Sequence, residues 1–107
     1  MKCFVTFRLR EGVTPEQYEK WFRDENVPAV RSMRSISGYR VWRATEAMDG
    51  EAPYDFIEEM EFADREAFDG EVESLPEMHA MLQGWFARVT DQAIVYAVEV
   101  PQEEEVR

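Results

Sequence analysis

Apolar and polar residues alternate along four segments of the chain, and each alternation predicts a strand. The predicted strands cover residues 3–10, 39–45, 54–62 and 93–100. In the first strand, one apolar face holds Cys3, Val5, Phe7 and Leu9. In the third, one face holds Tyr54, Phe56, Glu58, Met60 and Phe62, so a carboxylate interrupts an otherwise apolar row.

Helical spacing predicts two long helices and a short one. The first begins at Thr14, where Pro15 and Gln17 complete a capping signature. Its inward stripe holds Tyr18, Trp21, Phe22 and Glu25, and Pro28 interrupts or kinks it. Asp64 caps a short helix that runs to Phe68.

The second long helix is predicted to begin at Ser74, because Ser74-Leu75-Pro76-Glu77 repeats the capping signature. Its apolar stripe consists of Met78, Met81, Leu82, Trp85 and Phe86.

The element order β, α, β, β, α, β predicts an α+β, ferredoxin-like protein with a four-stranded antiparallel sheet and helices on one face. The predicted domain covers residues 1–101, and a charged tail covers 102–107. By parity the uncovered face of the sheet holds Phe4, Thr6, Arg40, Trp42, Ile57, Val95 and Ala97. Because this patch is largely apolar, we expect two copies to pair through it as a homodimer.

Composition narrows the functional classes. The net charge of −11 disfavours binding to nucleic acid. No apolar run is long enough to span a membrane, and the N-terminus lacks the layout of a signal peptide. The single cysteine, Cys3, cannot form an internal disulfide, so we expect a cytoplasmic protein. The sequence also lacks phosphate-binding and metal-binding motifs, so we expect no metal site.

Two titratable residues are candidates for catalysis. His79, the only histidine, lies at the margin of the apolar stripe of the second long helix and can transfer protons near neutral pH. The alternative is a surface or packed histidine. Glu58 is predicted to face the helices, where burial would raise its pKa. The alternatives are that Glu58 pairs with Arg43 or reaches solvent at a sheet edge.

Aromatic side chains and methionines gather on the helix-facing side of the sheet. Most of them are expected to form the core, but Tyr39 and Tyr96 bring hydroxyl groups that need partners. A cavity lined by rings and a few hydroxyls would suit an aromatic ligand. The residues expected to bind it are Phe7, Trp21, Tyr39, Arg43, Leu82, Trp85 and Tyr96.

Three segments resemble the dimeric α+β barrel superfamily: CFVTFRLREGVTPEQY at residues 3–18, SISGYRV at 35–41 and YDFIEEMEFADREAF at 54–68. Within it the chain is most similar to the REDY-like, HapK-type family of prodigiosin and bisindole pigment clusters. That resemblance implies a homodimer, a cavity in each subunit and no cofactor.

The resemblance also implies site residues. In the plant polyketide cyclase of the superfamily, a histidine on the second long helix works with a tyrosine. His79 falls close to that histidine, whereas residues 71–73 hold no tyrosine, so only the histidine carries over. The positions that would line the cavity are Cys3, Val5, Phe7, Trp21, Tyr39, Glu58, Leu82, Ile94 and Tyr96.

The leading hypothesis is a cofactor-free enzyme of secondary metabolism that binds a pyrrole-like or indole-like intermediate. His79 and Glu58 would transfer protons in a condensation, a cyclisation or a related reaction. The alternatives are a non-catalytic binding or shuttle protein, a cofactor-independent monooxygenase, and a structural dimer with a filled core.

Overall fold

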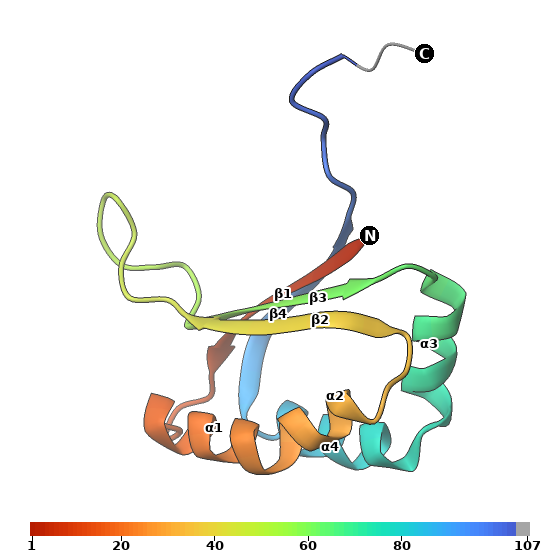
Figure 1. Cartoon of the computed structure of the whole chain (residues 1–107). Coiled ribbons are helices and arrows are strands. Elements are labelled where there is room, and N and C mark those ends of the chain that lie inside the picture. The colour runs from red at the N-terminus through yellow and green to blue at the C-terminus, as the bar shows by residue number, and fades with distance from the viewer. Residues whose placement is uncertain (105–107) are drawn as a thin grey trace.

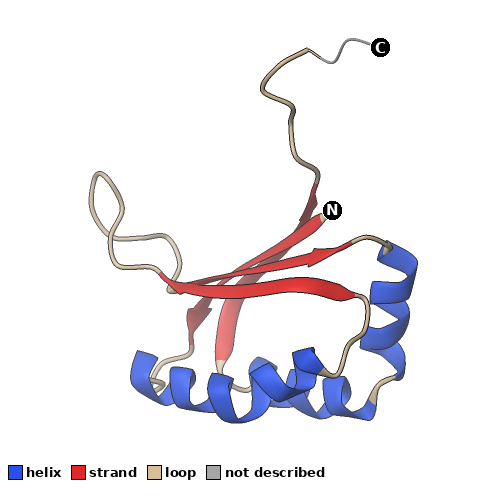
Figure 2. Cartoon of the chain, in the orientation of Figure 1, coloured by secondary structure: helices blue, strands red, loops and turns tan. Residues whose placement is uncertain are grey.

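The computed structural model describes residues 1–104 and consists of one sheet with all helices on one of its faces (Figures 1 and 2). The strands are β1 (Lys2–Leu9), β2 (Ile36–Arg43), β3 (Phe56–Phe62) and β4 (Val89–Ala97). The helices are α1 (Pro15–Trp21), the π-helix η1 (Phe22–Asn26), α2 (Val27–Arg31), α3 (Arg65–Ser74) and α4 (Pro76–Phe86). The strands pair antiparallel in the order β2-β3-β1-β4. The predicted ferredoxin-like fold is confirmed.

The predicted faces of the sheet are correct. Cys3, Val5 and Phe7 of β1 are buried under the helices, together with Phe56 of β3. Two strands begin at least three residues earlier than predicted. β4 begins at Val89, which pairs with Leu9 across a register shift. β2 begins at Ile36, because residues 37–38 form an irregularity within the strand rather than a turn before it.

The first helical region has the predicted N-terminus. Thr14 and Gln17 form a reciprocal capping box, and Pro15 lies in the first turn. Pro28 has no N–H to donate, so the regular helix cannot continue through it. The chain accommodates this with η1, in which the Val27 N–H donates to the Phe22 carbonyl, before α2 begins. This one-residue widening turns Asn26 inward, where it is 2% exposed.

The second helical region differs from the prediction. The helix capped by Asp64 runs to Ser74 instead of ending near Phe68. Leu75 precedes a proline and takes an extended conformation (ψ 121°), which separates α3 from α4. The predicted cap at Ser74 is therefore wrong, because that residue ends α3 and α4 begins without a side-chain cap.

The other face of the sheet has no helix over it (Figure 2). Trp42 and Val95 on this face are 51% and 54% exposed. Past β4 the chain leaves the sheet (Figure 1). The predicted tail, 102–107, falls partly outside the described residues, which end at 104. Within residues 1–104, no helix combines the length and apolar character required to cross a membrane.

Candidate functional site

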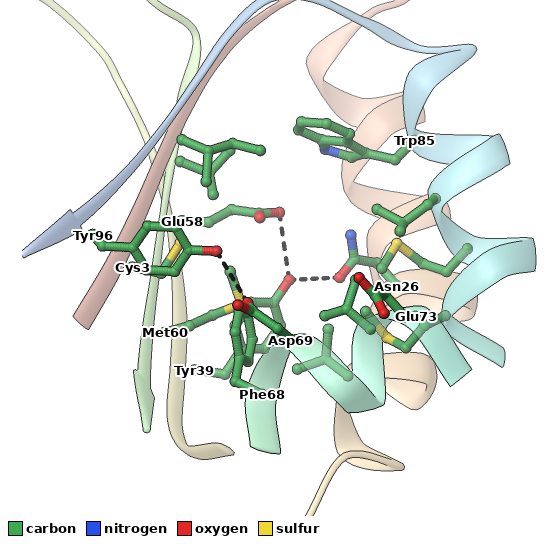
Figure 3. Close-up of a pocket in the computed structure, with 17 residues that line it drawn as sticks. Cys3, Asn26, Tyr39, Glu58, Met60, Phe68, Asp69, Glu73, Trp85 and Tyr96 are labelled. Atoms are coloured by element: carbon green, nitrogen blue, oxygen red, sulfur yellow. Dashed lines mark hydrogen bonds between the residues drawn. The ribbon is translucent and has the colours of Figure 1, made fainter. Parts of the chain in front are cut away.

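A cavity of about 220 Å³ lies between the sheet and the helices. All four strands contribute to its wall, together with η1, α2, α3 and α4. Figure 3 shows these side chains converging on one space. The lining residues are Cys3, Val5, Asn26, Val30, Tyr39, Glu58, Met60, Phe68, Asp69, Val72, Glu73, Met78, Met81, Leu82, Trp85, Ile94 and Tyr96.

Glu58 is the most deeply placed acid in this cavity. It lies on the inner strand β3, between Val5 of β1 and Val41 of β2, and is only 6% exposed. Burial raises the pKa of Glu58 to about 7, and the hydrogen bond from Tyr39 opposes that rise. A carboxyl group that titrates near neutral pH can both accept and donate a proton under ordinary conditions.

Both alternatives predicted for Glu58 are wrong. The residue is not at a sheet edge, because β3 lies between β2 and β1. It does not pair with Arg43, which binds Glu16 at 3.0 Å and Glu19 at 3.4 Å on α1. Arg43 is exposed at the end of the edge strand β2, where the two helical carboxylates hold it.

A chain of hydrogen bonds links Glu58 to the helices through Tyr39. The Tyr39 hydroxyl donates to Asn26 Oδ1 at 2.5 Å and lies 3.4 Å from Glu58 Oε1 (Figure 3). Because a phenol has one proton, Tyr39 can donate to Asn26 while it accepts from a protonated Glu58. When Glu58 is ionised, the same hydroxyl can donate to the carboxylate. The arrangement therefore offers hydrogen bonds to both protonation states of Glu58.

A second polar group lies on the side of the cavity formed by β4 and α3. The Tyr96 hydroxyl donates to Asp69 Oδ1 at 3.4 Å, and Arg65 Nε is 3.4 Å from Asp69 Oδ2. The Arg65 guanidinium lies 3.8 Å from the centre of the Tyr96 ring. Ile94 and Glu73 are the exposed members of the lining, so the cavity meets solvent beside this group.

The rest of the wall is aromatic, aliphatic or sulfur-containing. Trp85 is 4% exposed, and its Nε1 has no hydrogen-bond partner among the described residues. Burial and the nearby Glu58 raise the pKa of the Cys3 thiol to about 11, so this cysteine is neutral at physiological pH. Within residues 1–104, no group of three or more His, Cys, Asp or Glu side chains is placed to hold a metal ion.

The structure brings together eight of the residues singled out from the sequence, all of which line the cavity: Cys3, Val5, Tyr39, Glu58, Leu82, Trp85, Ile94 and Tyr96. Phe7 and Trp21 lie outside the lining, in the core. There the Phe7 ring packs against Tyr18, Phe56 and Trp85, and Trp21 packs against Tyr18.

His79 does not lie in the cavity wall. Its neighbour Met78 points inward and is buried, so His79 is turned out of the apolar stripe and is exposed. Its Nε2 donates to the carbonyl oxygen of Glu73, near the end of α3. A catalytic role for His79 therefore stays a prediction, and the geometry of the cavity does not use it.

Asn26 is the residue of this site that the sequence analysis missed. In a regular helix the stripe with Trp21 and Phe22 continues at Glu25, the residue that was predicted to face inward. Glu25 is exposed and Asn26 is buried, because η1 adds one residue to the turn. The signal in the sequence was Pro28, whose missing N–H forces the irregularity.

The chain matches the family model of the REDY-like protein HapK over residues 1–100. No curated protein sequence matches it. The crystal structure of HapK from Hahella chejuensis is 19% identical, with a TM-score of 0.70, and the alignment covers 98% of this chain and 100% of that one.

Two further solved structures share the fold. A dimeric ferredoxin-like protein of unknown function from Thermobifida fusca is 18% identical, with a TM-score of 0.71, over 91% of this chain and 89% of that one. SnoaB, a cofactor-independent oxygenase from Streptomyces nogalater, is 14% identical, with a TM-score of 0.69, over 95% and 96%. The structural homologues of this chain thus include dimeric proteins.

Proposed function

The chain belongs to the REDY-like HapK family, and from that membership we propose that it is a cofactor-free biosynthetic protein of secondary metabolism. It binds an aromatic, pyrrole-like or indole-like intermediate of prodigiosin-type or bisindole pigment synthesis in the cavity between sheet and helices. There it catalyses proton transfer in a condensation, a cyclisation or a related reaction.

The observation that carries this proposal is a single buried carboxyl group facing a cavity with ring-lined walls. Glu58 faces the cavity with a pKa of about 7 and is hydrogen-bonded to the Tyr39 hydroxyl. A heteroaromatic N–H or an acidic ring carbon needs a positioned base and a site from which water is excluded. A carboxyl group in this setting accelerates such a step by roughly 10²–10⁴-fold.

In the proposed mechanism, the rings of Trp85 and Phe68 hold the flat ligand, and Glu58 accepts a proton from it. Tyr39 then turns its hydroxyl from the carboxylate to Asn26 as the charge on Glu58 disappears. The proton remains on Glu58 until the product, or water entering beside Glu73, accepts it. His79 has no part in this sequence.

The test is to incubate the protein with an extract of its host and identify by mass spectrometry what co-purifies. With that compound as substrate, Glu58→Gln should retain binding and lose turnover by about 10²–10⁴-fold. The control His79→Ala should keep the turnover of the wild type. Unchanged turnover in Glu58→Gln would contradict the role given to Glu58.

The same cavity supports a second candidate, a non-catalytic protein that carries a reactive intermediate. It is favoured by the finding that Glu58 is the one buried carboxyl group among the described lining residues, so the cavity offers no second buried carboxyl group or imidazole to share the catalysis. In that case the compound that co-purifies is released unchanged by every variant. Because SnoaB is described as a cofactor-independent oxygenase, oxygen uptake is measured in the same assay; uptake that accompanies turnover would favour a monooxygenase.

We also propose that the chain forms a homodimer through the uncovered face of its sheet. The apolar side chains of Phe4, Trp42, Ile57 and Val95 share that face, and two of them are at least half exposed. Pairing two such faces removes this surface from water, which is the main driving force for association.

A further inference from the structure

The charges that line the cavity all have the same sign. Among residues 1–104, the carboxyl groups that line it are Glu58, Asp69 and Glu73, and no Lys, Arg or His side chain lines it. Arg65, which lies beside this group, contacts Asp69 and the Tyr96 ring. An anionic ligand would therefore meet carboxylates without a compensating positive charge.

Of these three carboxyl groups, Glu58 is the buried one, so its ionised form depends most on a counter-charge. Only 6% of its surface is exposed. Among the described residues its hydrogen-bond partner is the Tyr39 hydroxyl, which lies beside Oε1. Figure 3 shows its carboxyl group pointing into the cavity rather than back into the strand. Because Tyr39 supplies a neutral donor only, the ionised carboxylate has no counter-charge from the protein.

The walls around Glu58 favour a positive charge as well. The lining includes the rings of Trp85, Phe68, Tyr39 and Tyr96 and the sulfur atoms of three methionines. Aromatic faces attract cations, above all when water is excluded, and thioethers are polarisable. These contacts would add to the attraction of the carboxylates.

Resting on the proposed function, we propose that the cavity selects its ligand in a cationic form. The ligand class is a protonated nitrogen heterocycle or an iminium-bearing aromatic, with the Glu58 carboxylate as its counter-ion. When such a cation binds to the neutral Glu58, the carboxyl O–H bond breaks and the proton passes to the buffer. Neutral and anionic aromatics of the same shape bind less tightly.

The pH dependence of this binding follows from the groups that face Glu58 from each packed element. They are Cys3 of β1, Tyr39 of β2, Tyr96 of β4, Tyr18 of α1, Asn26 of η1, and Asp69 and Glu73 of α3, while α4 lines the cavity with uncharged residues. The thiol and all three phenols have raised pKa values and stay neutral. Glu58 therefore determines the pH dependence around neutrality.

The experiment is isothermal titration with three probes that share an indole ring: tryptamine (a cation), 3-propylindole (neutral) and indole-3-propionate (an anion). The first two have side chains of three non-hydrogen atoms, and in the third a carboxylate takes the place of the terminal atom. We expect tryptamine to bind at least about tenfold more tightly than 3-propylindole at pH 8, with indole-3-propionate the weakest. This preference should shrink by about tenfold between pH 8 and pH 5.5, as Glu58 becomes protonated. At pH 6, titrations in two buffers of different ionisation enthalpy should show that about half a proton is released per tryptamine bound.

Glu58→Gln should lose the preference for tryptamine and its pH dependence. The matched control is Glu77→Gln, which removes the same charge from an exposed position on α4 outside the cavity lining and should keep both. If 3-propylindole binds as tightly as tryptamine or more tightly at pH 8, or if the control loses the preference, the proposal that the cavity selects a cation is wrong. The proposal that the cavity binds an aromatic ligand would still stand. If none of the three probes binds at any pH, the proposed function fails with it.

Discussion

Glu58 occupies a position where an ionised carboxylate is costly, since its strand lies inside the sheet and none of the described basic residues lines the cavity. The structure offers it a phenol instead of a cation, and Asn26 provides the acceptor that the phenol needs when Glu58 is protonated. The consequence at the scale of single residues is a carboxyl group that exchanges its proton near neutral pH. Stability and hydrogen bonding then depend on whether it holds that proton.

Replacing this carboxyl group should change how stability depends on pH. The pKa of Glu58 is about 7 in the folded state and 4.5 in the reference state, so the folded state binds more protons between these values. The free energy of unfolding of the wild type therefore falls, relative to Glu58→Gln, by about 2–3 kcal/mol between pH 5 and pH 8. Urea unfolding at equal protein concentrations measures this difference.

The control for that experiment is the adjacent Glu59→Gln. Lys2 lowers the pKa of Glu59 through a 2.6 Å contact, so its contribution to stability has the opposite sign and is lost only as the pH falls below 4.5. Between pH 5 and pH 8 the difference between the wild type and Glu59→Gln should therefore stay nearly constant. A pH-independent difference between the wild type and Glu58→Gln would show that Glu58 titrates as an ordinary surface carboxylate.

Removal of the Tyr39 hydroxyl should affect both of its neighbours. In Tyr39→Phe the ionised Glu58 loses its donor, so the pKa of Glu58 rises further. The buried Asn26 Oδ1 also loses its partner, at a cost of about 1–3 kcal/mol in the free energy of unfolding. Carbon-13 NMR of the carboxyl groups reports the titration, and denaturant unfolding reports the stability. Tyr96→Phe, at the cavity opening, should leave the midpoint of Glu58 unchanged; a fall in that midpoint in Tyr39→Phe would refute the assigned hydrogen bond.

At the scale of elements, the cavity depends on how the helices break. Pro28 forces η1, which brings Asn26 inward, and Leu75 separates α3 from α4 before Pro76. The two helical regions approach each other closely at Gly84 of α4, where an added Cβ would lie 3.0 Å from Trp21 Cζ2. The Trp21 ring can approach α4 because that position has no side chain.

This contact predicts a contrast between two glycine substitutions. Gly84→Ala should cost about 1–3 kcal/mol of stability, because the added methyl group displaces the Trp21 ring or the helix. Gly70→Ala in α3, where a Cβ meets nothing within 4 Å, should gain about 0.5–1 kcal/mol from helix propensity. Thermal unfolding compares them, and equal stabilisation by both would show that α4 does not rest on Trp21.

Sequence patterns predicted the strands and the face that each residue occupies, because strand alternation has a fixed period of two. They also placed Glu58, Tyr39 and Tyr96 beneath the helices. They did not predict Asn26, because a π-helical turn changes the period at one point. His79 was expected at the inner margin of its stripe; most of the stripe is buried as predicted, but Met78 points inward and the adjacent His79 is exposed, because helical periodicity does not decide the exposure of a residue at the margin.

At the scale of the whole molecule, the sheet has one face that encloses the cavity and another that carries exposed apolar side chains. Pairing two copies through the second face would leave both cavities on the outside of the dimer. Dimerisation and ligand binding are then separable, because no residue of the open face lines the cavity among the described residues.

A charge in the open face should therefore break the dimer without closing the cavity. Val95→Glu places a carboxylate at a 54% exposed position opposite Phe4 of β1, and we expect a monomer that still binds tryptamine. Ala80→Glu, on the exposed side of α4, is the control and should remain dimeric. Light scattering after gel filtration measures the mass. A monomeric wild type, or a dimeric Val95→Glu, would contradict pairing through this face.

The most direct test of the central claim is the carboxyl titration of the wild-type protein by carbon-13 NMR, with Glu58 assigned by its absence in Glu58→Gln. The account predicts one carboxyl resonance with a midpoint near pH 7 that moves to lower pH when tryptamine is bound. A Glu58 midpoint near 4.5, unaffected by tryptamine, would mean that this carboxyl group is solvated and that no ligand approaches it.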